Sequence, residues 1–422
     1  MSRALEIARR AERFDEVERA DPAMAFVHLV AACAWMAMLS IARAPEGIAF
    51  GILMAVAAVR APKTARLYPA LLGSSAFVLF LAFVEWQALS VLWSSAPNLG
   101  VRDWVPRFVF VPLALWPVMH RWPAMMVALV AGAAVHAAVL TCVAVARTGW
   151  RPGQANGLLT KDICMTGVAF AVAVGAVAGR PWGRGWFGWA SRAGVTVPLV
   201  LGQLILGQRM PVIASAAGGA VAVARPRAGR RRAPWAWIGV GAVAIAVAGG
   251  FLAASPRNRA WITRTWSLVA ADADTVTDDQ LMRISGARFP LYRLALEMWE
   301  QHPIVGHGAR SYAVASKDRF TCAPADYGIP PTQASSMATL ACAHNAFLDE
   351  ASERGIIGLG LLVALLSACW WRAWRLDPWS GTAGMLGVWT VACLTQSMTV
   401  RGVAVLVLAV LVTRCAFVER DP

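Results

Sequence analysis

Charged residues are scarce in this sequence, and lysine is nearly absent from it. Charged side chains make up 15% of the 422 residues and hydrophobic side chains 58%, whereas soluble domains carry about 25% charged residues. The lysines are Lys63, Lys161 and Lys317. This composition excludes a soluble multidomain enzyme and indicates a protein that crosses a membrane many times.

Long polar stretches are also rare, because apolar runs close to the ~20 residues that cross a bilayer recur along the chain. The sequence therefore predicts an all-α polytopic membrane protein with about 12 transmembrane helices. We expect the spans near residues 24–42, 45–59, 70–93, 105–120, 123–146, 162–179, 193–208, 210–224, 234–254, 346–369, 381–399 and 402–418.

The predicted organisation places one large helical loop between the ninth and tenth spans. The parts are a cytoplasmic segment at 1–22, transmembrane helices 1–9 at 23–254, a periplasmic loop at 255–345, helices 10–12 at 346–418 and a cytoplasmic tail at 419–422. The first part mixes both signs of charge, so we expect no cleavable signal peptide.

Acidic residues are too few to balance the basic ones, which gives a formal net charge of +15. The basic residues collect in alternate short loops, on the side that holds both predicted termini. This is the positive-inside pattern, and it orients both termini toward the cytoplasm. The charge therefore describes topology, and we expect no nucleic-acid partner.

The cysteines lack the spacing and histidine partners of a zinc site. Most of the eight lie in or beside apolar spans, but Cys322 and Cys342 lie in the outward loop. A periplasmic loop is in an oxidising compartment, so we predict a disulfide between these two.

Residues 281–301 of the loop have apolar side chains at helical spacing, which predicts an amphipathic helix. Pro290 would kink this helix or mark its first turn. His302-Pro303 would end it, and Gly306 and Gly308 would make a tight turn.

Ionisable groups gather on the outward side, where a charge at bilayer depth is costly and usually functional. They are Arg209 at the outer end of the seventh span, Arg288 and Arg293 in the loop, and His344 where the loop re-enters the membrane. Arg288 and Arg293 are five residues apart, so we expect only one of them to face a given ligand. Asn345 is suited to cap the tenth span.

The order of these motifs resembles the O-antigen ligase and polymerase superfamily, and most closely an O-antigen ligase. An outward Arg209 is followed by Gly-Ala-Arg288-x3-Tyr292, by His302-Pro303-Ile-Val-Gly306-His-Gly308, and by His344-Asn345-x2-Leu348-x4-Glu353-x-Gly355. The departures are His307, where the family usually has an apolar residue, and Tyr292, where it often has Trp.

The resemblance implies a glycosyltransferase of lipopolysaccharide biosynthesis in the bacterial inner membrane, with its active site facing the periplasm. It implies transfer of O-antigen polysaccharide from undecaprenyl diphosphate to a sugar hydroxyl of lipid A-core. His344 would be the catalytic base, and Arg209 and Arg288 would bind the diphosphate.

Arg293, Lys161, Asn345 and Glu353 are further candidates for substrate binding. His307 is a possible rival of His344. Asp272-Ala-Asp274 has the Asp-x-Asp spacing of metal-dependent glycosyltransferases, but it lies in a polar run that is typical of a solvated turn. We therefore expect no metal and no cofactor.

Other functions stay open at this point. An O-antigen polymerase, a protein O-oligosaccharyltransferase and a lipid-linked glycan transporter all fit a multi-span chain. Transport sites usually lie near the bilayer midplane, whereas the groups above lie at one outer interface. The sequence leaves the transferred glycan, the acceptor hydroxyl and the oligomeric state undetermined.

Overall fold

The structure of the protein is a computed structural model. It describes residues 3–41, 43–103, 107–148, 163–179, 186–206, 209–224, 288–377, 379–399 and 402–418, with isolated positions between 259 and 285. All elements of these ranges are helical, as the sequence predicts.

The first half of the chain contributes the helices that form most of the apolar body. They are α1 (Arg3–Ala20), α2 (Pro22–Met38), α3 (Arg43–Thr64), α4 (Tyr68–Leu72), α5 (Ser75–Leu89), α6 (Pro97–Asp103), α7 (Arg107–Leu115), α8 (Trp122–Thr148), α9 (Ile163–Gly179), α10 (Trp186–Leu206) and α11 (Arg209–Ala224).

The second half contributes a small polar module and three further apolar helices. The module is made of α15 (Phe289–Gln301), α16 (Ser311–Cys322) and α17 (Pro331–Ala338), and the apolar helices are α18 (Ala346–Arg375), α19 (Ser380–Cys393) and α20 (Gly402–Val418). Helix α15 has Pro290 in its first turn and ends at Gln301, before His302. Both features agree with the sequence-based expectation.

Four described helical stretches are long and apolar enough to cross a membrane, or five if a bent pair at 12–38 counts as one span. They are Pro45–Leu72, Ser75–Trp93, Phe108–Arg147 and Ala346–Arg375. The spans expected at 105–120 and 123–146 form one helical stretch, and the one expected at 234–254 lies outside the described residues. Five other apolar helices are shorter, so the number of twelve stays a prediction.

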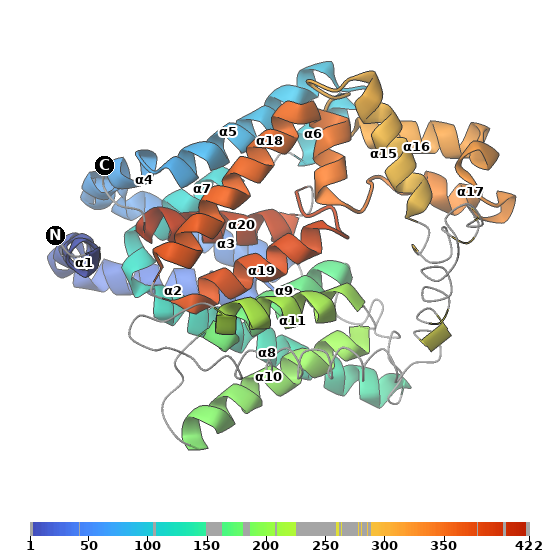
Figure 1. Ribbon diagram of the computed structural model, residues 1–422. Helices are drawn as coiled ribbons and strands as arrows, with labels where there is room; N and C mark the ends of the chain where they lie inside the picture. The colour runs from blue at the N-terminus through green and yellow to red at the C-terminus, as the bar shows by residue number, and fades with distance from the viewer. Residues whose placement is uncertain are drawn as a thin grey trace.

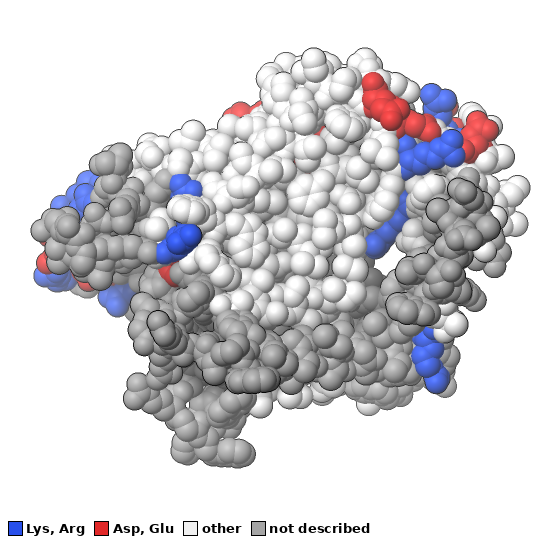
Figure 2. All heavy atoms as spheres, in the orientation of Figure 1, with Lys and Arg blue, Asp and Glu red and all other residues white. Residues whose placement is uncertain are grey.

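The distribution of charge fits a molecule that lies across a bilayer. Both termini lie at the same end of the molecule, opposite α15–α17 (Figure 1). On the face drawn in Figure 2, Lys and Arg predominate at the terminal end and charges of both signs gather at the α15–α17 end, while the described surface between them is largely uncharged, with a small acidic patch at its upper edge. A broad apolar belt between two charged ends is expected of a multi-pass membrane protein.

Small residues bring the central helices close together. Gly175 of α9, Gly218 of α11 and Gly384 of α19 face one another, and the Cβ of an alanine at any of them would meet a neighbouring backbone. Such close approach is how helices associate where lipid removes the hydrophobic driving force. Helix α18 packs against α5.

The polar module has its own hydrophobic core, separate from that of the apolar body. Its members come from α15, α16, α17 and the segment before α18: Leu291, Leu294, Ala295, Met298, Tyr312, Phe320, Tyr327, Ile329, Met337 and Ala343. Residues 321–343, expected as an ordered loop, include helix α17 and a 3-10 turn at Pro324–Tyr327.

The predicted disulfide is wrong, because Cys322 and Cys342 are not bridged. Cys322 is exposed at the end of α16, where its thiol faces Asp318. Cys342 is buried at the base of the module. One thiol is exposed and the other is buried, so the two do not meet in the folded module.

Helix α18 is broken near its start. Gly355 has φ 65° and ψ −164°, which is not helical. The backbone carbonyls of Ser352 and Glu353 accept hydrogen bonds from the amides of His307 and Gly308, at 3.1 and 2.7 Å. Beyond the break, the Ile356 amide donates to the Pro303 carbonyl at 2.8 Å. The turn at 302–308 is therefore bonded into the gap in α18.

Both the break in α18 and the turn that is bonded into it require glycine. Gly306 has φ 69° and Gly355 φ 65°, a left-handed conformation that side chains disfavour. A Cβ on Gly306 would collide with the backbone of Glu353 and Arg354, and a Cβ on Gly355 with the carbonyl of Ile304.

We predict that Gly355→Ala lowers the stability of the detergent-solubilised protein by about 2 kcal/mol or more, since strain and a backbone clash add. Thermal unfolding measures it. Gly360→Ala is the matched control, because it is on the same helix with open space around its Cα. If both variants melt like the unmodified protein, the turn is not held in the gap.

Candidate functional site

His344 lies in a strained backbone conformation between two fixed points. Its φ is 56°, and the left-handed region costs a non-glycine residue about 1–2 kcal/mol. Before it, the amide of Ala343 donates to the carboxyl Oδ1 of Asp349 at 2.7 Å. After it, Asn345 begins helix α18. Strain of this kind persists only where the surroundings impose it, and it clusters at functional sites.

Asn345 caps α18 as the sequence predicts. Its side-chain oxygen accepts from the amides of Phe347 and Leu348, at 3.0 and 3.2 Å. Its side-chain nitrogen donates to the carbonyl of Leu394 at 3.2 Å. Asn345 thereby joins the start of α18 to the segment after α19, and its role in this structure is that of a cap.

Tyr292 brings Arg288 to the His344-Asn345 segment. Burial raises the pKa of the Tyr292 hydroxyl, and the side chains of Arg288 and Asn345, both against that hydroxyl, oppose the rise. Arg288 is held in turn by Ser285, whose hydroxyl accepts from the amides of Arg288 and Phe289. A guanidinium and the residue after the predicted base therefore come from segments more than fifty residues apart and reach the same tyrosine hydroxyl.

Arg293 lies elsewhere, on the exposed side of α15. It donates to Glu297 at 3.3 Å, and its guanidinium lies 5.7 Å from the centre of the Tyr327 ring. Tyr327 donates to Glu297 at 2.6 Å; burial and the Glu297 carboxylate raise the pKa of Tyr327 to about 12. Of the two loop arginines, Arg288 is the one that approaches His344-Asn345.

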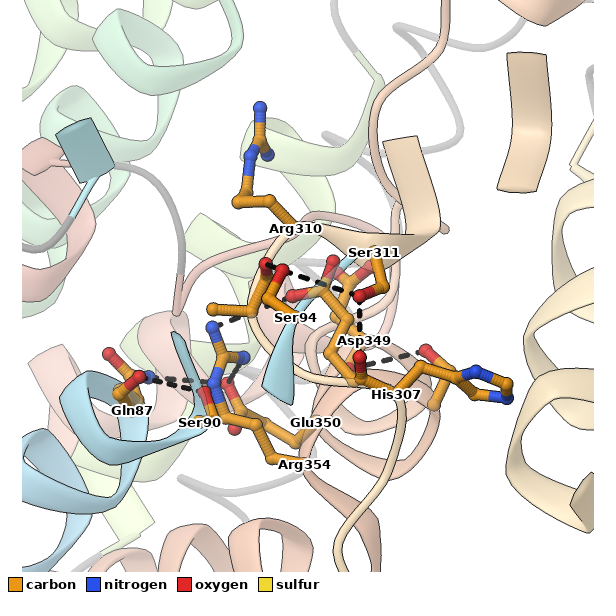
Figure 3. Close-up of polar contacts among 12 residues, drawn as sticks. Gln87, Ser90, Ser94, His307, Arg310, Ser311, Asp349, Glu350 and Arg354 are labelled. Atoms are coloured by element: carbon orange, nitrogen blue, oxygen red, sulfur yellow. Dashed lines mark hydrogen bonds and ion pairs between the residues drawn. The ribbon is translucent and has the colours of Figure 1, made fainter. Parts of the chain in front are cut away.

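Glu353 belongs to a buried charged cluster at the break in α18, of which Figure 3 labels Glu350 and Arg354. Arg354 donates to Glu350 at 3.0 Å, and its other terminal nitrogen lies 3.5 Å from Glu353. Gln87 of α5 also donates to Glu350, at 3.3 Å. All three charged side chains are less than 5% exposed. The cluster ties α5 to α18, and Glu353 is part of that tie.

His307 is built into the glycine turn. Its Nε2 lies 2.9 Å from the carbonyl of Met298, and its ring stacks edge-on against His302 at 4.4 Å between centroids. Burial, then the nearby His302, lower the pKa of His307. Its ring points away from the Glu350–Arg354 cluster (Figure 3). These contacts favour a structural role for His307.

Arg209 is the first residue of α11, but its side chain is not among those that the structure describes. Lys161 and the Asp272-x-Asp274 pair lie outside the described residues. From the predicted set the structure therefore places the side chains of Arg288 and Asn345 beside Tyr292, and the approach of His344, Arg209 and Lys161 to one ligand stays a prediction.

Two residues at this site were missed in the sequence. Arg310 has φ 66° and, in the described part of the chain, is the one non-glycine residue besides His344 with positive φ. It donates to the carbonyl of Ala341 at 3.3 Å, which puts it beside the segment that leads to His344. In Figure 3 its side chain points away from the buried cluster. Its place directly after the turn of Gly306 and Gly308 was the available signal. The second missed residue, Asp349, carried none, because an acidic residue in the first turn of a helix is ordinary.

The fold and site describe a multi-pass membrane protein whose polar module lies at the end opposite the termini. Residues 194–363 match the family model described as O-Antigen ligase. The match runs from α10 into α18 and includes Arg209, Arg288 and His344. It confirms the predicted resemblance to the O-antigen ligase and polymerase superfamily. No curated protein matches the chain.

The buried Arg354–Glu350 pair and the exposed Arg293–Glu297 pair should contribute differently to the free energy of unfolding. Arg354→Ala leaves two buried carboxylates without their cation and should cost about 3–5 kcal/mol. Arg293→Ala removes a pair that is 45% and 38% exposed, and should cost under about 1 kcal/mol. Chemical denaturation of both variants in the same detergent measures the difference. Equal stabilities would mean that the buried cluster does not hold α18 to α5.

Proposed function

We propose that the protein transfers O-antigen polysaccharide from undecaprenyl diphosphate to a sugar hydroxyl of lipid A-core at the periplasmic face of the inner membrane. The reaction inverts the anomeric centre and needs no metal. His344 is the base, and Arg288 and Arg209 bind the diphosphate. The match to the O-antigen ligase family supports transfer of this general type.

The observation that carries the proposal is that the side chains of Arg288 and of Asn345, the residue next to His344, both lie against the Tyr292 hydroxyl. Expelling a diphosphate needs a multidentate cation, and a guanidinium matches phosphate oxygens better than an ammonium does. Activating an acceptor hydroxyl needs a base that is neutral near pH 7, which an imidazole is. One site therefore offers both requirements within reach of one substrate.

In the proposed reaction the imidazole of His344 removes the proton from the acceptor hydroxyl. The hydroxyl oxygen attacks the anomeric carbon, and the bond between that carbon and the diphosphate oxygen breaks. The undecaprenyl diphosphate leaves with the bonding electron pair, and the guanidinium groups stabilise its charge. Stabilising charge that develops in the transition state is usually the largest contribution to such catalysis.

Arg310 is a further guanidinium for the same diphosphate. It lies beside the segment that ends at His344, and its side chain points away from the buried cluster (Figure 3). The largely uncharged surface of Figure 2 ends near this module, and in this proposal the lipid carrier reaches the site sideways from the outer leaflet. This placement suits a transferase at the membrane surface better than a transporter with a midplane site.

His344→Ala should lower the rate of ligation by about 100-fold or more, the range that a positioned base contributes. The assay joins purified undecaprenyl diphosphate-linked glycan to purified lipid A-core in reconstituted vesicles. His307→Ala is the matched control and should retain transfer, because its ring is built into the turn. A His344→Ala variant that ligates normally would falsify the assignment of the base.

Arg288→Ala should lower turnover by about 100-fold, the usual cost of removing one donor to a developing anion. Arg288→Lys should recover only part of it, since the ammonium is not bidentate. Lys317→Ala, an exposed cation in the same module, controls for a general loss of charge. Equal rates for Arg288→Ala and Lys317→Ala would remove Arg288 from the diphosphate site.

The acceptor separates the proposed ligase from its relatives. Deletion of the gene should abolish lipopolysaccharide ladders and leave the polymerised glycan on its carrier. Core capped by a single repeat would instead identify a polymerase, and loss of glycan from a protein would identify a protein O-oligosaccharyltransferase.

A further inference from the structure

We infer that Asp349 is a positioning residue, which acts through the backbone to hold His344 in its working orientation. The inference rests on the proposed function for its catalytic consequence, but not for the backbone clamp itself. Asp349 is in the first turns of α18, five residues beyond His344, and its side chain is 1% exposed.

The clamp consists of one short hydrogen bond to the residue before His344. The Ala343 amide donates to Asp349 Oδ1 at 2.7 Å, and Ala343 is 0% exposed. Without this acceptor the amide would be buried and unpaired, which natural structures avoid. The bond thus makes the segment turn back over the start of its own helix.

A second fixed point follows directly, since Asn345 caps α18 through Phe347 and Leu348. His344 lies between the two bonds, and a chain fixed on both sides of one residue leaves that residue little choice of φ. The left-handed φ of 56° is the result. The direction of the His344 side chain therefore depends on Asp349, although the two side chains need not touch.

Asp349 lies against a second part of the protein. Ser397, in the segment between α19 and α20, lies near its carboxyl. The same segment accepts a hydrogen bond from the Asn345 side chain at the Leu394 carbonyl. Residues 394–397 therefore lie beside the start of α18, and the Asn345 bond fixes one end of the clamp to them.

An asparagine at 349 separates the clamp from the charge. Its side-chain oxygen can still accept from the Ala343 amide, and its nitrogen can donate to the Ser397 hydroxyl, whereas alanine does neither. If the acceptor oxygen matters, Asp349→Asn should keep transfer within about threefold of the unmodified protein. Asp349→Ala should lower kcat by about 100-fold, since misplacing a catalytic group by an ångström has that effect. The KM for the lipid-linked donor should not change.

Ser352→Ala is the matched control. It also removes bonds between a side chain and the backbone of α18, from the Ser352 hydroxyl to the carbonyls of Leu348 and Asp349 at 2.8 and 3.3 Å, and leaves the Asp349 carboxyl unchanged. It does not touch residues 343–345, so its kcat should stay normal. In a His344→Ala background, Asp349→Ala should cause no further loss, because both act through one imidazole.

Amide hydrogen exchange tests the clamp without any substrate. The peptide that contains Ala343 should exchange about tenfold faster or more in Asp349→Ala, and at the normal rate in Asp349→Asn and Ser352→Ala. Unchanged exchange in Asp349→Ala, normal kcat in that folded variant, or an Asp349→Asn as slow as Asp349→Ala would each overturn the inference. If exchange responds as expected while the unmodified protein transfers no glycan, the proposed function fails and the clamp stands.

Discussion

The hydrogen bonds across the break in α18 are the constraint on which the rest of the structure depends. A continuous helix would use the carbonyls of Ser352 and Glu353 within itself, and the left-handed Gly355 releases them to the turn at 302–308. A buried backbone group must have a partner, so the turn and the break can form only together. This mutual dependence attaches the polar module to a helix that enters the membrane.

The attachment explains why a module with its own core can carry part of a membrane site. Helix α15 leads directly into the turn, so fixing the turn also fixes the end of α15 that carries Met298, whose carbonyl meets His307. At its other end α15 carries Arg288 and Tyr292, which reach Asn345 at the start of α18. The C-terminal end of α15 is thus linked through the turn to the break in α18, and its N-terminal end to the start of α18. The site lies between these two connections.

The sequence predicted those features that depend on local physics. The apolar runs predicted a helical membrane protein, His302-Pro303 predicted the end of α15, and Asn345 predicted a cap, whereas Pro290 left a kink or a first turn open. Features that depend on contacts distant in sequence were not predictable. The break at Gly355 needs Gly306 as its partner, fifty residues earlier. The bridge expected between Cys322 and Cys342 did not form, because one thiol is exposed and the other is buried. The position of Arg310 is set by its bond to Ala341, and that of Asp349 by its bond to Ala343 and its place near Ser397.

The central claim is that Arg288 and His344 serve one substrate, with the diphosphate on the first and the acceptor hydroxyl on the second. A cryo-electron microscopy structure of the protein with bound undecaprenyl diphosphate-linked glycan tests it most directly. The account predicts the diphosphate within hydrogen-bonding distance of the Arg288 guanidinium and the anomeric carbon open to attack from the side of the His344 imidazole. A diphosphate bound elsewhere, or an imidazole directed away from the anomeric carbon, would contradict it.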